Sequence, residues 1–153
     1  TDIVGVQVGG AVKNVLAIAS GMARGSGFGE NSIAALITRG LSEMRRLAQA
    51  MGGSPETLVG LSGLGDVLLS CSSRQSRNFL FGELIGKGNE KRAALEKIGG
   101  VVEGWFSTAS VIKKQRELKI DLPICKTMYG ILHNDDDIKK SVAELLKRPI
   151  RPE

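Results

Sequence analysis

Apolar residues between positions 33 and 51 recur at the spacing of one helix face, and this pattern constrains the fold more than any other. The residues that share the face are Ile33, Leu36, Ile37, Leu41, Met44, Leu47, Ala48 and Met51. Asn31 or Ser32 can cap the start of this helix, and Gly52 and Gly53 can end it. Strand-like alternation is nearly absent elsewhere, and aromatic residues make up only 4% of the chain. We therefore predict an all-helical domain.

The other segments complete a bundle of roughly eight helices. Residues 3–8 are expected to form a short extended entry segment, followed by a helix over residues 11–20 that Gly21 ends. Further helices are predicted to start at Ser54 and to span residues 65–71, 76–85, 89–98, 104–118, 123–132 and 135–147. No linker or repeat interrupts the pattern, so residues 1–153 are predicted to form one domain. The tail 148–153, which contains two prolines, is expected to be loose.

The bulk properties narrow the class of protein without fixing its partner. The net charge of +5 suits an anionic partner, which could be nucleic acid, a membrane surface or a small phosphate ester. Uninterrupted apolar runs such as residues 15–19 are too short to cross a bilayer, and the N-terminus carries no secretory signal. Cys71 and Cys125 do not frame a disulfide scaffold, so we expect a reducing cytoplasm. The absence of an initial Met suggests a piece of a longer protein.

Lys13 is the single charged residue in an apolar stretch that runs from Gly9 to Ser20. The stem of such a lysine can lie along the core while its ammonium reaches water. Alternatively, a partly desolvated ammonium in this position can exchange a proton with a substrate. The pattern alone leaves both interpretations open.

Two carboxylates stand alone between apolar residues and glycines. Asp66 follows Gly63 and Gly65, and it can either cap a helix or orient a substrate hydroxyl or Lys13. Glu103 lies between Val102 and Gly104, and it can either be a first-turn acid or hold a ribose hydroxyl.

Ser76, Arg77 and Asn78 stand at the start of a predicted helix. A hydroxyl, a guanidinium fork and exposed helix amides together favour a phosphate group. The same residues are also consistent with a solvated arginine cluster and a serine cap.

Other features point away from common cofactor and metal sites. Residues 25–29 are rich in glycine, but they follow a helix and lack the spacing and the βαβ surroundings of a dinucleotide-binding fingerprint. His133 is the only histidine, and two distant cysteines do not make a zinc site, so no metal site is expected. Residues 134–137, an Asn followed by three Asp, could look like a metal cluster, but they lie where a helix cap is expected.

Taken together, these motifs resemble the C-terminal domain of bacterial NAD(P)-dependent glycerol-3-phosphate dehydrogenases. The matching stretches, in order along the chain, are residues 5–15, 35–41 with Glu43 and Met44, 63–66, 75–78 and 101–104. The resemblance runs from Ile3 to about Leu146, and the ordered set is far more specific than any single motif. The fold that it implies is a multi-helix bundle like the C-terminal domain of 6-phosphogluconate dehydrogenase-like enzymes.

The resemblance implies an enzyme that interconverts dihydroxyacetone phosphate and sn-glycerol 3-phosphate for phospholipid synthesis. It implies that Lys13 is the general acid/base, which protonates the C2 oxygen as hydride arrives from the nicotinamide. Asp66 and Asn14 would fix the lysine and the substrate oxygens.

The resemblance also implies a phosphate cradle made of Ser76, Arg77 and Asn78. Arg77, Val101 and Glu103 would contact the cofactor, NAD or NADP. That cofactor would be held mainly by an N-terminal dinucleotide-binding domain to which nothing in this chain corresponds. The chain alone is therefore expected to be inactive.

Three rival interpretations remain at this point. The helical domain of another β-hydroxyacid dehydrogenase would bind a carboxylate substrate, and the cradle at residues 76–78 argues against it. A basic nucleic-acid-binding module is disfavoured because the basic residues are spread along the chain. A dimerisation domain built on residues 33–51 is compatible with the enzyme, so a homodimer is possible. We expect a small-molecule substrate and neither a nucleic-acid nor a membrane partner.

Overall fold

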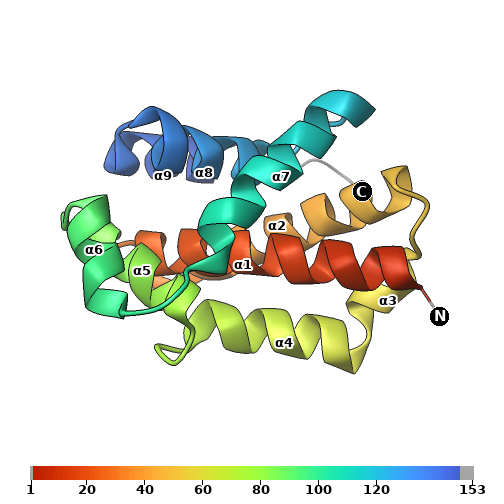
Figure 1. The fold of residues 1–153 in the computed structure, drawn as a ribbon, viewed down its shortest axis with the longest axis horizontal. Helices are drawn as coiled ribbons and strands as arrows, with labels where there is room; N and C mark the ends of the chain where they lie inside the picture. The colour runs from red at the N-terminus through yellow and green to blue at the C-terminus, as the bar shows by residue number, and fades with distance from the viewer. Residues whose placement is uncertain (1, 149–153) are drawn as a thin grey trace.

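The computed structural model describes residues 2–148, except for the side chains of residues 61 and 62, and this range is all-helical without a strand (Figure 1). Its nine helices are α1 (Ile3–Gly25), α2 (Glu30–Ala50), α3 (Pro55–Val59), α4 (Leu61–Ser72), α5 (Arg77–Gly86), α6 (Lys91–Ile98), α7 (Glu103–Leu118), α8 (Pro123–Asn134) and α9 (Ile138–Lys147). The predicted fold class is confirmed. Of the tail, only Arg148 falls within the described residues.

Helix α1 runs through the middle of the molecule and contacts α2, α3, α4, α5, α7 and α8 (Figure 1). Its fully buried residues include Val12, Val15, Leu16, Ala17 and Ile18. The prediction of an extended segment over residues 3–8 is wrong, because the helix already begins at Ile3. Asp2 caps this start: its Oδ1 accepts a hydrogen bond from the Gly5 amide at 2.8 Å, and its Oδ2 accepts one from the Ser54 amide at 2.9 Å. A contact with a distant segment therefore stabilises the first turn.

The prediction that Gly21 ends the first helix is also wrong, because α1 continues to Gly25. Gly21 and Gly25 on α1 lie against the backbone of α5, and Gly82 and Gly86 on α5 lie against the backbone of α1. A Cβ at any of these four positions would overlap a carbonyl oxygen of the opposite helix. The glycines thus allow two helix backbones to touch, and this tertiary contact offsets their low helix propensity.

The 23-residue helix α1 is long and apolar enough to cross a membrane by length and composition, which the short uninterrupted apolar runs did not suggest. Half of its most apolar window is buried inside the molecule. Contacts with six other helices account for this apolar character, because a helix surrounded by protein is apolar on most sides.

Helix α2 buries the predicted apolar face within the same chain, including Ile33, Leu36, Met44 and Leu47. This face is therefore not available for the dimer that the pattern could have supported. Its start differs from the prediction, since the carbonyl of Gly29 accepts the first hydrogen bonds and Gly29 precedes the helix in place of Asn31 or Ser32.

Most later helices begin and end within a few residues of their predicted bounds. Helix α4 is the exception and starts before residue 65. Gly63 lies inside α4 and packs closely against α3, since a Cβ at this position would come within 2.6 Å of the Leu58 carbonyl oxygen. The acidic segment after α8 caps helices as expected: Asp135 ends α8 in the left-handed region, and Asp137 caps α9 by accepting from the Lys140 amide at 2.7 Å.

A buried carboxylate joins α2 to α8, and the sequence analysis missed it. Glu43 is only 4% exposed, and its oxygens accept hydrogen bonds from the amides of Ile124 at 2.6 Å and Cys125 at 3.1 Å. Burial raises the pKa of Glu43 to about 7, while the two backbone donors oppose that shift. Glu43 therefore serves as the N-terminal cap of a helix distant in the sequence.

Candidate functional site

Lys13 and Asp66 form an ion pair between α1 and α4, 53 positions apart in the sequence. The Lys13 Nζ donates to Asp66 Oδ2 at 2.6 Å, and the two side chains are 23% and 52% exposed. The interpretation of Asp66 as a helix N-cap is wrong, because Asp66 lies inside α4. Its neighbour Val67 and the Lys13 neighbour Val12 are buried, so the pair lies at the edge of the core with its charged atoms accessible.

Asn14, Asn78 and Glu103 form a second group that joins α1, α5 and α7. The Nδ2 of Asn14 donates to Glu103 Oε2 at 3.1 Å, and the Nδ2 of Asn78 donates to Asn14 Oδ1 at 3.2 Å. The amide of Gly104 donates to Asn78 Oδ1 at 2.8 Å. Glu103 is the first residue of α7, so it is a first-turn acid and also takes part in a long-range contact.

Ser76 and Arg77 begin α5 as predicted. Ser76 is the N-cap, and its Oγ accepts a hydrogen bond from the Phe79 amide at 3.3 Å. The exposed side chain of Arg77 lies against Gly100, where an added Cβ would be 2.8 Å from the Arg77 Cζ. Val101, the next residue, is 61% exposed. The guanidinium of Arg77 is thus beside the loop that leads to Glu103.

The loop before α5 is held by an ion pair that the sequence analysis did not identify. Arg74 donates from Nε to Glu83 Oε2 at 2.9 Å and from Nη2 to Glu83 Oε1 at 2.5 Å. Lys87 donates to the same carboxylate at 2.9 Å, and the hydrogen bond from Arg74 is the main cause that lowers the pKa of Glu83. Arg74 therefore does not belong to a freely solvated cluster, and the loop that carries Ser76 is fastened to α5.

The contacts bring five of the eight predicted site residues together in two groups, to which Ser76, Arg77 and Val101 do not belong. Lys13 with Asp66 makes one group, and Asn14 with Asn78 and Glu103 makes the other. The two groups meet because Lys13 and Asn14 are consecutive on α1.

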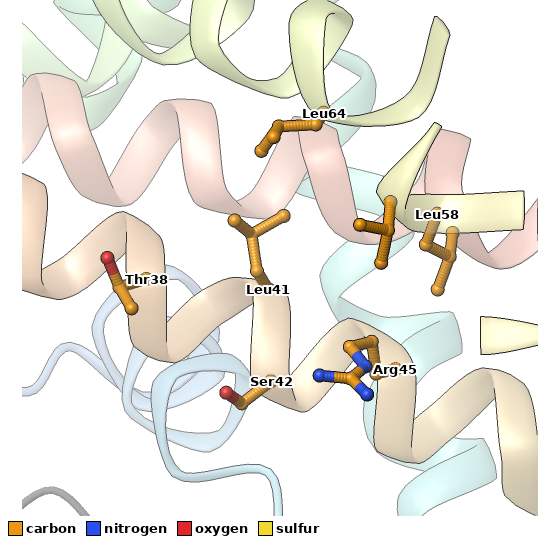
Figure 2. A pocket seen from close by; sticks show the side chains of 7 residues that line it. Thr38, Leu41, Ser42, Arg45, Leu58 and Leu64 are labelled. Carbon is orange, nitrogen blue, oxygen red and sulfur yellow. The ribbon is translucent and has the colours of Figure 1, made fainter. Parts of the chain in front are cut away.

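A separate pocket of about 190 Å3 lies between α2, α3 and α4 (Figure 2). Its lining residues are Thr38, Leu41, Ser42, Arg45, Leu58, Val59 and Leu64. None of the predicted site residues lines it. Within residues 2–148 as described, no group of three or more His, Cys, Asp or Glu side chains could hold a metal ion.

Comparison with known proteins gives these contacts a family context. The family model of the NAD-dependent glycerol-3-phosphate dehydrogenase C-terminus matches residues 2–143. The glycerol-3-phosphate dehydrogenase [NAD(P)+] of Thioalkalivibrio sulfidiphilus is 49% identical over 152 residues, which are 99% of this chain and 46% of the relative. That of Prosthecochloris aestuarii is 45% identical over all 153 residues, again 46% of the relative.

A solved structure shares the fold. The crystal structure of glycerol-3-phosphate dehydrogenase from Coxiella burnetii matches 97% of this chain with a TM-score of 0.94 and 46% sequence identity, and the match covers 46% of that protein. This chain thus spans about half the length of the relatives that it matches. It belongs to the NAD-dependent glycerol-3-phosphate dehydrogenase family and corresponds to the C-terminal domain of these enzymes.

Proposed function

We propose that this chain is the substrate-binding domain of an enzyme that reversibly reduces dihydroxyacetone phosphate to sn-glycerol 3-phosphate in phospholipid synthesis. The observation that carries the proposal is the accessible Lys13–Asp66 pair, which places a proton donor in the mostly apolar middle of α1. A ketone reduction needs such a donor next to the carbonyl oxygen.

In this mechanism the Lys13 ammonium protonates the C2 oxygen of the substrate, and in the reverse direction the neutral amine removes that proton. Asp66 holds the Lys13 nitrogen at 2.6 Å, which orients the lysine before the substrate arrives. Asn14, the next residue, retains one amide hydrogen to donate to a substrate oxygen, because only one is used in its contact with Glu103.

The substrate phosphate would bind at the start of α5. The Ser76 Oγ accepts a hydrogen bond from the Phe79 amide, and its hydroxyl hydrogen can still be donated to a phosphate oxygen. Arg77 is exposed and presents a planar fork that matches two phosphate oxygens. Asn78 has a second amide hydrogen beyond the one given to Asn14.

The residues around Gly100 fit a role in contacting NAD or NADP. Arg77, Val101 and Glu103 are all exposed there, and they offer a cation, an apolar surface and a carboxylate. When bound, the nicotinamide supplies or accepts the hydride. We propose that an N-terminal dinucleotide-binding domain, as the two-domain length of the relatives suggests, holds most of this cofactor.

The proposal places the enzyme in the cytoplasm with a small anionic substrate as its partner, and it includes no nucleic-acid or membrane partner. A homodimer would have to use a surface other than the apolar face of α2, because that face is buried within the chain.

Two substitutions in a full-length enzyme carrying this domain test the proposal. Lys13→Ala should lower kcat by about two to four powers of ten with a much smaller change in KM, because it removes the proton donor. Arg77→Ala should mainly raise KM, because its contact with the phosphate exists in both the ground and transition states. Steady-state kinetics with dihydroxyacetone phosphate measure both effects. A Lys13→Ala enzyme with normal kcat and only a raised KM would make Lys13 a binding residue and refute the mechanism.

The isolated chain should show no turnover with either cofactor.

A further inference from the structure

The contacts of Asn14, Asn78, Glu103 and the Gly104 amide close into a ring of hydrogen bonds. The Gly104 amide donates to Asn78, Asn78 donates to Asn14, and Asn14 donates to Glu103. Glu103 and Gly104 are consecutive, so the series returns to the residue next to its origin. Three helices, α1, α5 and α7, meet in this ring.

The direction of every hydrogen bond in the ring is fixed by its two ends. A backbone amide can only donate, so Asn78 must present Oδ1 to Gly104 and Nδ2 to Asn14. Asn14 must then present Oδ1 to Asn78 and Nδ2 to Glu103, whose carboxylate accepts. Each side-chain amide consequently has one favourable orientation of the two that an isolated amide could adopt.

The ring has little room to rearrange around Gly104, which is buried. A Cβ at this position would be 2.6 Å from Ile18 Cδ1, 2.8 Å from the Asn14 carbonyl oxygen and 3.0 Å from Asn78 Oδ1. The Gly104 carbonyl also accepts from the Thr108 hydroxyl, which is fully buried. The end of α7 that closes the ring is therefore held in close contact with α1.

We propose that Asn78 is a positioning residue that acts through Asn14, in addition to any contact with the substrate phosphate. By fixing the Asn14 amide, Asn78 directs the remaining Asn14 N–H toward the substrate oxygen that Lys13 protonates. This role rests on the proposed function. A positioning role for Asn78 differs from a phosphate-binding role because it depends on Glu103, which accepts the other hydrogen bond of the Asn14 side chain.

Moving the negative charge from position 103 to position 78, which reverses the two hydrogen bonds of Asn14, tests the proposal in a full-length enzyme. In Asn78→Asp, the new carboxylate still accepts from Gly104 but cannot donate to Asn14. Asn14 then turns over to donate to it, which places the Asn14 oxygen against the Glu103 carboxylate. Adding Glu103→Gln supplies a donor to that oxygen and closes the ring again, with both hydrogen bonds of Asn14 reversed and that of the Gly104 amide unchanged. Glu103→Gln alone keeps the original direction, since its amide oxygen can accept from Asn14.

The first readout is the melting temperature. We expect Asn78→Asp to lower it by about 4 °C and the addition of Glu103→Gln to recover most of the loss, because the ring is closed again. Asn89→Asp is the matched control: Asn89 donates to the Leu84 carbonyl, away from the ring. Its effect should be unchanged by Glu103→Gln. Additive effects of Asn78→Asp and Glu103→Gln would overturn the ring.

The second readout is kcat, which separates positioning from a purely structural role. The double variant should have a kcat on the order of tenfold to a hundredfold below that of Glu103→Gln alone, because Asn14 is turned over in a well-folded enzyme. Equal kcat values for these two proteins would overturn the positioning role. A rise confined to KM, without coupling in melting temperature, would make Asn78 a phosphate ligand only. An inactive wild-type enzyme would instead refute the proposed function, while the melting temperatures would still decide whether the ring exists.

Discussion

Two carboxylates, Glu43 and Asp66, each join helices that are far apart in the sequence, but they do so in opposite surroundings. Glu43 is 4% exposed and accepts from two backbone amides of α8, whereas the Asp66 side chain is 52% exposed and accepts from the Lys13 ammonium. The donors to the buried carboxylate are backbone amides at the start of α8. The exposed pair keeps its charges within reach of a ligand. The difference separates a residue that maintains the architecture from a pair that is available for chemistry.

The largest effect should come from removing the buried carboxylate. Glu43→Ala leaves the amides of Ile124 and Cys125 buried without their acceptor, so this chain should lose about 2–5 kcal/mol of unfolding free energy. Urea unfolding measures the loss, with Asp66→Ala as the exposed counterpart, for which less than about 1 kcal/mol is expected. Similar losses for the two variants would remove the distinction between the two carboxylates.

The pH dependence of stability should sharpen the comparison. The pKa of Glu43 is raised by burial from 4.5 to about 7, so the unfolded chain loses this proton at lower pH than the folded chain. The proton bound to Glu43 therefore stabilises the folded chain fully below about pH 4.5, and this stabilisation is lost as the pH rises to about 7. The unfolding free energy should fall by about 3 kcal/mol over this range. Urea unfolding of the wild type and Glu43→Gln across this range should show a smaller decline in the variant. Parallel curves would assign the dependence to other groups.

The smallest effect on folding should come from the exposed pair. Asp66→Asn keeps an oxygen that can accept from Lys13 but removes the charge, so the unfolding free energy should change by less than about 1 kcal/mol. Raising the salt concentration should reduce even this difference, because it screens exposed charges. A loss above about 2 kcal/mol, insensitive to salt, would show that the pair supports the fold as Glu43 does.

Local sequence rules predicted the helices whose ends depend on local residues. The apolar stripe of α2, the Ser76 cap of α5 and the acidic cap of α9 all follow from neighbours in the sequence. The start and the end of α1 could not be predicted in this way. The contact of Asp2 with Ser54 and that of Gly21 with α5 both depend on residues more than fifty positions away.

The candidate site shows the same division. The motifs identified Lys13, Asp66 and Asn78 as residues of interest, and a link between Asp66 and Lys13 was one of the alternatives for this carboxylate. The ring that joins Asn78 to Gly104 could not be predicted, because helical periodicity does not specify which helices face each other. Glu43 was missed for the same reason, since the α8 amides that it caps lie 81 and 82 positions along the chain.

The glycine contact between α1 and α5 has a consequence for the spacing of the site. Lys13 and Asn14 belong to α1, and Ser76, Arg77 and Asn78 stand at the start of α5. Where these two helices touch through Gly21, Gly25, Gly82 and Gly86, backbone meets backbone, and no flexible side chain lies between them to change its rotamer. The contact therefore fixes the distance between the proton donor Lys13 and the proposed phosphate site at the start of α5. Substitutions elsewhere in the core act through side chains that can change rotamer, so we expect them to alter this spacing less than a substitution at one of the four glycines.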